Sequence, residues 1–227
     1  MSLSTFDLLK VGIGPSSSHT VGPMHAAQMY AVALSDTGSL NRCYRLNTEL
    51  FGSLGATGAG HGSPKAIILG LEGDVSDTAD IDGIEARVAA AREHGSLILL
   101  GIHQIAFDCH DDLVMHRTET LPFHANGMRF MAYDEQGETL QTRVYYSVGG
   151  GFVVDESVSD GDVVVDDPTP VRYPFSTAEE LLAQCKEHGL SISSLMLANE
   201  LAWRSEAEIR SGLLALWEVM QACIDRG

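Results

Sequence analysis

The stretch GMRFMAYDEQGETLQTRVYYSV, residues 127–148, predicts two β-strands joined by a turn at Gln136-Gly137. Apolar and polar residues alternate on both sides of the turn, as they do in strands that bury one face. The segment YRLNTEL at 44–50 alternates in the same way. A β-sheet is therefore expected in this part of the chain.

Three helices are predicted around these strands. GPMHAAQMYAVALS at 22–35 and SPKAIILGL at 63–71 carry apolar residues at helical spacing, each with a proline in its first turn. IEARVAAAREHG at 84–95 ends on a glycine after a basic last turn. Helices mixed with strands predict an α+β fold, a mixed α/β sandwich, over residues 1–154.

An acidic, proline-containing stretch follows this block. DESVSDGDVVVDD at 155–167 holds six carboxylates and no basic residue, and PTPVRYP after it holds three prolines. This composition is typical of a surface linker, which we expect over 155–173. The three valines at 163–165 leave open a short strand within it.

The signal after the linker is purely helical. STAEELLAQCKEHG at 176–189 predicts a helix that opens with a capping box from Ser176 to Glu179 and ends at Gly189. The helical period continues to the end of the sequence. We therefore expect a short all-helical segment over 174–227.

Composition restricts the class of protein. With 227 residues, 44% hydrophobic and 20% charged, the chain can bury a core. A formal net charge of -17 disfavours nucleic acid and anionic membranes as partners. No apolar run approaches about 18 residues and no signal peptide is evident, so we expect a cytoplasmic protein. Irregular spacing indicates reduced core thiols rather than disulfides or a zinc site for Cys43, Cys109, Cys185 and Cys223.

The segment IGPSSSHTVGPM at 13–24 is a candidate anion site, suited to an amino-acid carboxylate. Its hydroxyls and imidazole precede a helix N-terminus, where backbone N–H groups lack partners. The polar residues are Ser16, Ser17, Ser18, His19 and Thr20. The alternative is a simple helix cap, with the remaining hydroxyls facing water.

A glycine-rich segment, FGSLGATGAGHGSPKA at 51–66, predicts a loop whose backbone approaches a ligand closely. His61 within it is a candidate acid or base, or else a surface residue of a turn. Lys65 suggests a Schiff base with pyridoxal phosphate, against the alternative of a solvated lysine in a first helical turn.

A third segment, PFHANGMRF at 122–130, carries His124 two residues before the turn signal Asn126-Gly127. Like His19 and His61, His124 lies at an element boundary, and the three histidines are candidates for one pocket. Four other histidines have the pattern of ordinary surface or helix-end residues: His94, His110, His116 and His188.

Five motifs occur in order along the chain: IGPSSSHTVGPMHAA, FGSLGATGAGHGSPKAIILGL, HANGMRF, YYSVGGGF and ISSLMLANELAW. Together they resemble the iron–sulfur-dependent bacterial L-serine dehydratases, or L-serine ammonia-lyases, of the single-chain type. The resemblance implies a complete N-terminal β domain, similar to the allosteric substrate-binding domain of some phosphoglycerate dehydrogenases. The linker and only the opening helices of the catalytic α domain would follow it.

The resemblance implies a lyase that converts L-serine to pyruvate and ammonia with a [4Fe-4S] cluster as Lewis acid. The family's cluster cysteines would lie further on, so we expect no metal ligands or cluster in this chain, which alone would be inactive. The implied partners are L-serine and the catalytic α domain, as a continuation or a separate chain, with no nucleic acid and no membrane. A homodimer is also compatible with the family.

Roles for the candidate residues follow from the same resemblance. His61 is expected to be the base that removes the Cα proton, and His124 to position the substrate or assist proton transfer. The residues expected to bind the substrate are Ser16, Ser17, Ser18, His19, Thr20 and Asn126. Two alternatives stay open: a serine-sensing allosteric module without chemistry of its own, and a pyridoxal-phosphate dehydratase that uses Lys65.

Overall fold

The computed structural model describes residues 3–157 and 169–227. The chain divides into two compact units, one formed by Gly12–Val164 and the other by Met1–Val11 together with Val165–Gly227. The expected bounds of the β domain, the linker and the helical segment stay predictions. The three valines at 163–165 lie outside the described residues.

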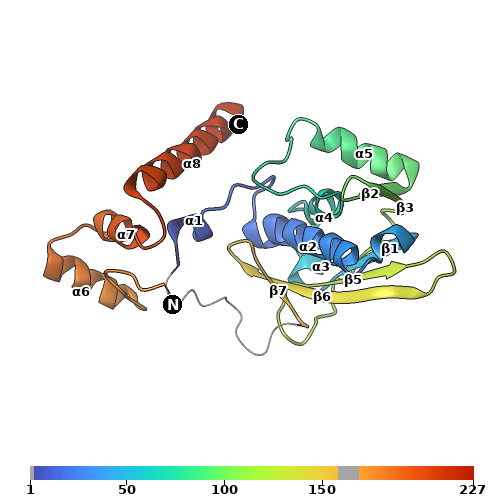
Figure 1. Cartoon of the computed structure of the whole chain (residues 1–227), viewed down its shortest axis with the longest axis horizontal. Coiled ribbons are helices and arrows are strands. Elements are labelled where there is room, and N and C mark those ends of the chain that lie inside the picture. The colour runs from blue at the N-terminus through green and yellow to red at the C-terminus, as the bar shows by residue number, and fades with distance from the viewer. Residues whose placement is uncertain (1–2, 158–168) are drawn as a thin grey trace. The chain divides into compact units, whose positions relative to one another are not determined.

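The larger unit contains a seven-stranded mixed sheet in the order β2-β3-β1-β5-β6-β7, with β4 also paired to β1 (Figure 1). β1 runs parallel to β3 and β4 and antiparallel to β5. The strands are β1 (Arg45–Leu50), β2 (Ser96–Leu99), β3 (His103–Ala106), β4 (Leu113–Met115), β5 (Gly127–Tyr133), β6 (Thr139–Gly149) and β7 (Phe152–Asp155). The predicted hairpin is confirmed as β5 and β6, with Gly137 in the turn at a positive φ of 83°.

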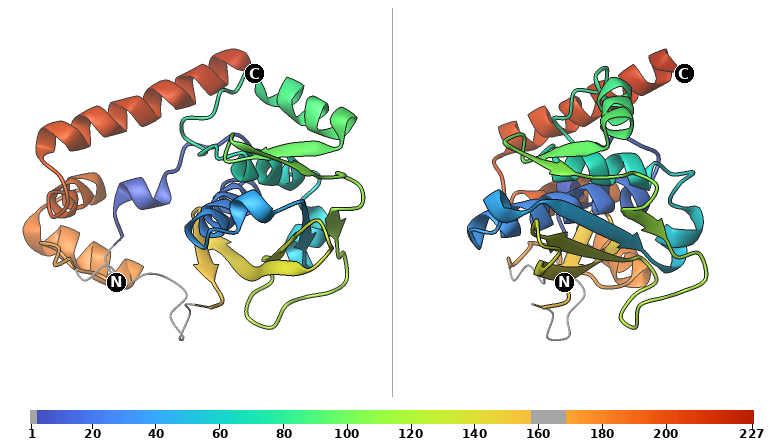
Figure 2. Two further views of the ribbon diagram at one scale, coloured as in Figure 1. Left: turned by 45° about the vertical axis from the view of Figure 1, so that its right-hand side comes forward. Right: turned by 90° about the vertical axis from the view of Figure 1, so that its right-hand side faces the viewer.

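The helices of this unit include α2 (Gly22–Asp36) and α4 (Ser63–Leu71), which pack against each other. On α2, the buried ring of Tyr30 stacks on Phe130 of β5 at 5.2 Å between centroids, and its hydroxyl donates to the carbonyl of Gln141. Tyr30 therefore anchors the helix to the sheet. Figure 2 shows α5 (Ile84–His94) beside the β2–β3 hairpin.

The predicted helices are confirmed, and the α+β fold class with them. α5 ends at Gly95 in the left-handed conformation that glycine favours. The glycine-rich segment expected as a loop is instead helical over α3 (Gly52–Thr57), before turns lead to α4. Short helical turns also occur as η1 (Ser17–Val21) and η2 (Leu40–Arg42).

The described elements of the smaller unit are all helical, as the sequence predicts: α1 (Thr5–Leu8), α6 (Ala178–His188), α7 (Ile192–Glu200) and α8 (Glu206–Arg226). One detail of the prediction is wrong. The capping box of α6 joins Thr177 to Glu180 rather than Ser176 to Glu179, because Thr177 has the extended backbone of an N-cap and accepts from the Glu180 N–H. Gly189 ends α6, as predicted.

The N-terminal residues pack with this helical unit, an arrangement that the sequence did not suggest. Glu200 is only 2% exposed and accepts hydrogen bonds from the Ser4 hydroxyl, the Thr5 N–H and the Arg204 guanidinium. The Arg204 guanidinium also lies over the ring of Phe6. A buried carboxylate with several donors thus attaches α1 to α7. Among the described residues, no helix has both the length and the apolar character needed to cross a membrane.

We expect Gly70→Ala to destabilise the larger unit by about 1–3 kcal/mol, because overpacking forces the backbone to move. A Cβ at Gly70 would lie 2.1 Å from the carbonyl oxygen of Met24 on α2. Urea unfolding followed by far-UV circular dichroism measures the change. Gly60→Ala is the matched control, since its added Cβ would meet its nearest neighbour at an ordinary 3.6 Å. Equal stability of both variants would contradict this account of the α2–α4 contact.

We expect Glu200→Ala to destabilise the smaller unit by roughly 1–3 kcal/mol, because buried donors of α1 lose their acceptor. The two tryptophans of the chain, Trp203 and Trp217, both lie in this unit, so their fluorescence reports its unfolding separately. Glu206→Ala removes an exposed ion pair with Arg210 and should leave the transition nearly unchanged. A fluorescence transition that responds equally to both changes would argue against the buried anchor.

Candidate functional site

The serine-rich segment forms a helical turn rather than the expected loop. Ser16 is the N-cap of η1: its hydroxyl accepts from the N–H of His19 at 3.2 Å. η1 continues directly into α2, so the first turn of the combined helix begins at Ser17 and Ser18. Backbone N–H groups in a first turn have no preceding helical carbonyl to bond. The N-terminus of the combined helix therefore lies at these two serines, upstream of Pro23.

Two buried hydroxyls connect the segments of His19 and His61. The Thr20 hydroxyl donates to the carbonyl of His61 at 2.8 Å, and the Ser63 hydroxyl donates to the carbonyl of His19 at 2.5 Å. Thr20 and Ser63 are both fully buried. The imidazole rings lie 5.1 Å apart between centroids, at 50° to each other. The structure thus brings together two of the three segments singled out in the sequence.

The tautomer of His61 follows from its hydrogen bond. Nδ1 of His61 lies 2.9 Å from the carbonyl oxygen of Thr57 in α3. Because a carbonyl oxygen can only accept, Nδ1 must carry the hydrogen and donate. In the neutral ring the lone pair is then on Nε2, the arrangement that a general base requires.

His124 has the opposite arrangement. Its Nδ1 accepts from the backbone N–H of Asn126 at 3.1 Å, so the neutral ring carries its hydrogen on Nε2 and acts there as a donor. The side-chain amide of Asn126 donates to the carbonyl of Ser147 and fixes the loop on β6. The neighbouring carbonyl of Ala125 accepts from the Ser53 N–H at 2.9 Å, which joins this loop to α3. The His124 segment therefore adjoins the helix that follows β1.

Sequence reasoning missed Ser53 and Ser63. Ser53 Oγ lies 3.0 Å from Nε2 of His19, and Ser18 Oγ lies 2.9 Å from Nδ1 of the same ring. The partners of Ser53 and Ser63 are 34 and 44 residues away in the sequence. No local pattern distinguishes these two serines from capping residues, so only the fold reveals them.

The environment of His19 disfavours its charged form. Burial lowers its pKa, the nearby His61 charge lowers it further, and a hydrogen bond with the backbone of Ser53 opposes this change. His19 is therefore predominantly neutral near neutral pH.

Other residues considered in the sequence lie in different settings. Lys65 forms an ion pair with Glu85 at 3.0 Å between Nζ and Oε1, in the first turn of α4. His116 is not an ordinary surface residue, because its ring stacks on Phe51 and its nitrogens pair with the carboxylates of Glu49 and Glu119.

The four cysteines do not form a cluster site. Cys43 is buried, Cys109 and Cys185 are partly buried, and Cys223 is exposed; all four are free thiols. Within residues 3–157 and 169–227, no three His, Cys, Asp or Glu side chains gather in a way that could hold a metal ion. The described residues therefore do not fit an iron–sulfur cluster, and no metal site is assigned to them.

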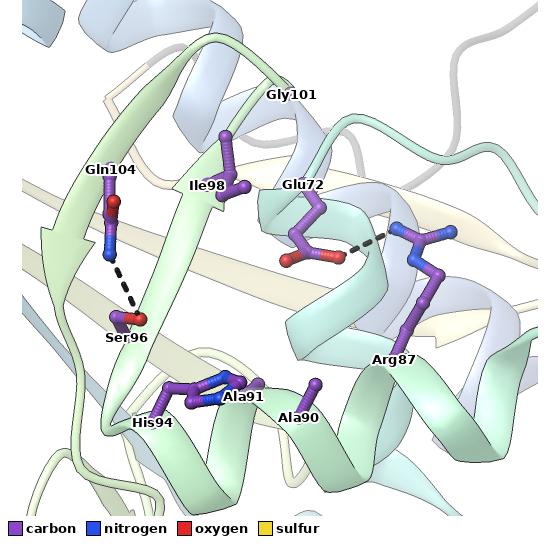
Figure 3. A pocket seen from close by; sticks show the side chains of 9 residues that line it. All are labelled: Glu72, Arg87, Ala90, Ala91, His94, Ser96, Ile98, Gly101 and Gln104. Carbon is purple, nitrogen blue, oxygen red and sulfur yellow. Dashed lines mark hydrogen bonds and ion pairs between the residues drawn. The ribbon is translucent and has the colours of Figure 1, made fainter.

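A separate cavity of about 570 Å³ lies between α5 and the β2–β3 hairpin (Figure 3). Arg87 at its wall is held by Glu72 and Asp74, each at 2.6 Å, and Gln104 bonds Ser96 on the opposite side. None of the lining residues belongs to the predicted site. The cavity is therefore not part of the predicted substrate site.

The fold and the site together define a mixed α/β domain that gathers hydroxyls and imidazoles beside one helix N-terminus. The family model described as serine dehydratase beta chain matches residues 4–158. The chain therefore belongs to the serine dehydratase beta chain family.

Curated relatives agree with this assignment. The chain is 56% identical over 227 residues to L-serine dehydratase of Streptomyces coelicolor, and the match covers 100% of this chain and 50% of that protein. It is 44% identical over 226 residues to L-serine dehydratase 1 of Escherichia coli, covering 99% and 49% of the two chains. The Mycobacterium tuberculosis L-serine dehydratase is 43% identical over 226 residues, with coverage of 100% and 48%. The chain thus spans about half the length of the relatives it matches.

We expect His19 to titrate below its ordinary pKa of 6.5, and His61→Gln to move that pKa upward because one of the two lowering causes is removed. Histidine ring signals followed by NMR across pH measure this. His110, whose pKa is raised by Asp111, is an internal reference that should not respond. An unchanged His19 midpoint in the variant would contradict the coupling between the two rings.

The same shift has a consequence for stability. Because folding lowers the pKa of His19, the unfolded chain binds the proton more readily. The contribution of His19 to the free energy of unfolding is therefore retained above pH 6.5, and it is lost as the pH falls from 6.5 through the lower folded pKa.

Proposed function

We propose that this chain forms the β-domain half of an L-serine dehydratase site, which binds L-serine and removes its Cα proton. Three relatives bear the name L-serine dehydratase, and the chain spans about half of each. The observation that carries the proposal is the hydrogen bond from His61 Nδ1 to the Thr57 carbonyl. In the neutral ring this bond leaves the lone pair on Nε2, and the ring centroid lies 5.1 Å from that of His19, in the helical turn that starts at Ser17.

In this proposal the substrate carboxylate lies at that helix start. The N–H groups and hydroxyls of Ser17 and Ser18 are its donors, with Ser16 and His19 beside them. Thr20 contributes to the site indirectly. Its hydroxyl donates to the His61 carbonyl and thereby positions the base. Asn126 likewise contributes by fixing the loop that carries His124.

His61 Nε2 accepts the Cα proton, and the electron pair of the C–H bond forms the Cα–Cβ double bond as the β-hydroxyl leaves. Hydroxide is a poor leaving group unless an acid or an electrophile takes its charge. The Nε2–H of His124 is a donor of the right kind to orient this hydroxyl. The proton taken up by His61 passes to the departing hydroxide, which restores the neutral imidazole and gives aminoacrylate and water. Aminoacrylate then tautomerises to an imine that water hydrolyses to pyruvate and ammonia.

The catalytic α domain is the second part of the proposal, as a continuation of this chain or as a separate chain. It would carry the [4Fe-4S] cluster that the family resemblance implies. The described cysteines of this chain do not gather into a site for it. The reaction therefore depends on groups outside the described residues, and the 227-residue chain by itself should not release pyruvate.

A serine-sensing module is the second candidate. The observation that favours it is that the hydroxyl and histidine site is formed entirely within Gly12–Val164, so that it needs no other domain to take up a carboxylate. In that case serine would bind here as an effector, and His61 would have no role in proton transfer.

The test uses a chimera in which this chain replaces the matched half of the Streptomyces coelicolor enzyme. We expect His61→Gln to lower kcat for pyruvate release by about 10²–10⁴, the usual contribution of a general base, with little change in KM. His110→Gln, at an exposed histidine paired with Asp111, is the control and should be neutral.

Different outcomes separate the candidates. An unchanged kcat with an altered serine concentration dependence would favour the sensing module over the proposed half-site. Pyruvate release by the 227-residue chain alone would overturn the need for an α domain.

A further inference from the structure

The ring of His19 bridges two hydroxyls. Ser18 Oγ lies 2.9 Å from Nδ1 and Ser53 Oγ lies 3.0 Å from Nε2. A neutral imidazole has one donor nitrogen and one acceptor nitrogen. The two hydrogen bonds must therefore run in the same direction through the ring, either from Ser18 to Ser53 or from Ser53 to Ser18.

The direction decides what Ser18 can offer a ligand. If Ser18 donates to His19, its single hydrogen is used within the protein. If Ser53 donates to Nε2, then Nδ1–H donates to Ser18, and the Ser18 hydrogen can go either to Ser16 Oγ, 3.4 Å away, or to a ligand. A carboxylate next to Ser18 needs a hydrogen-bond donor, so it favours the direction from Ser53 through His19 to Ser18. In this direction each hydrogen bond also polarises the next.

We propose that Ser53 is a positioning residue that holds His19 as the Nδ1–H tautomer and thereby directs the Ser18 hydroxyl toward the substrate carboxylate. This inference rests on the proposed function for its ligand, L-serine. Ser53 itself acts through His19 and has no assigned contact with substrate.

The surroundings of Ser53 suit this role. Its N–H donates to the Ala125 carbonyl at 2.9 Å, and its own carbonyl accepts from the Thr57 hydroxyl at 2.9 Å, so its backbone is fixed at both groups. Burial and the neighbouring His61 lower the pKa of His19, which maintains the neutral ring that the directed chain requires. The short helix α3 thus sets two tautomers, that of His19 through Ser53 and that of His61 through Thr57.

The test compares the 227-residue chain with its Ser53→Ala and Ser53→Thr variants, labelled with ¹⁵N in the histidine rings. At a pH where His19 is neutral, ring nitrogen shifts should show the Nδ1–H tautomer in the original chain. Ser53→Ala should move His19 toward the Nε2–H tautomer and raise the Kd for L-serine about five- to tenfold, the effect of one hydrogen bond. Ser53→Thr keeps a hydroxyl and should restore both.

Each outcome bears on the proposal. An unchanged His19 tautomer in a Ser53→Ala variant whose His61 signals and circular dichroism match the original would overturn it. An Nε2–H tautomer of His19 in the original chain would also overturn it. If the original chain binds no L-serine, the proposed function and the role of Ser18 fail, while the tautomer comparison still decides whether Ser53 positions His19.

Discussion

Two hydrogen bonds from buried hydroxyls to carbonyls hold the candidate site together. Thr20 donates to the carbonyl of His61, and Ser63 donates to the carbonyl of His19. Each histidine is thus fixed by a hydroxyl residue that follows the other one in sequence. Because α2 and α4 continue directly from these residues, the packing of the two helices sets the spacing of the imidazoles. Any sliding of one helix along the other would therefore change the distance between the two imidazoles.

The sequence predicts those elements whose own residues carry a complete signal, among them β1, the hairpin of β5 and β6, and the helices α2, α4, α5 and α6. It did not single out β2, β3, β4 or β7, since strands of three or four residues are too short for alternation to be evident. The glycine-rich segment that contains α3 instead predicts a loop, because glycine disfavours helices. Tertiary contacts override this preference, as the bond from the Ser53 N–H to the Ala125 carbonyl shows.

The candidate site likewise has one part that the sequence predicts and one part that only the structure reveals. His19, His61 and His124 were recognisable as polar residues at element boundaries, and the structure brings the first two rings together. The groups that orient them were not recognisable. The tautomers of His61 and His124 are set by a backbone carbonyl and a backbone N–H, which residues of almost any type can supply. A pattern of residue types therefore indicates which imidazoles are candidates but not which nitrogen of each carries the proton.

The buried bond between Ser4 and Glu200 joins residues 196 positions apart in one helical unit. On the ribosome, the α1 segment therefore emerges long before the segment of α7 that it packs against. At synthesis rates of about 5–20 residues per second, that delay is about 10–40 s. During this interval the apolar side chains of the α1 segment remain available to chaperones and to neighbouring nascent chains. The helical unit is thus completed only after the segment of the larger unit has emerged, whereas the larger unit can fold as soon as its own continuous segment has emerged.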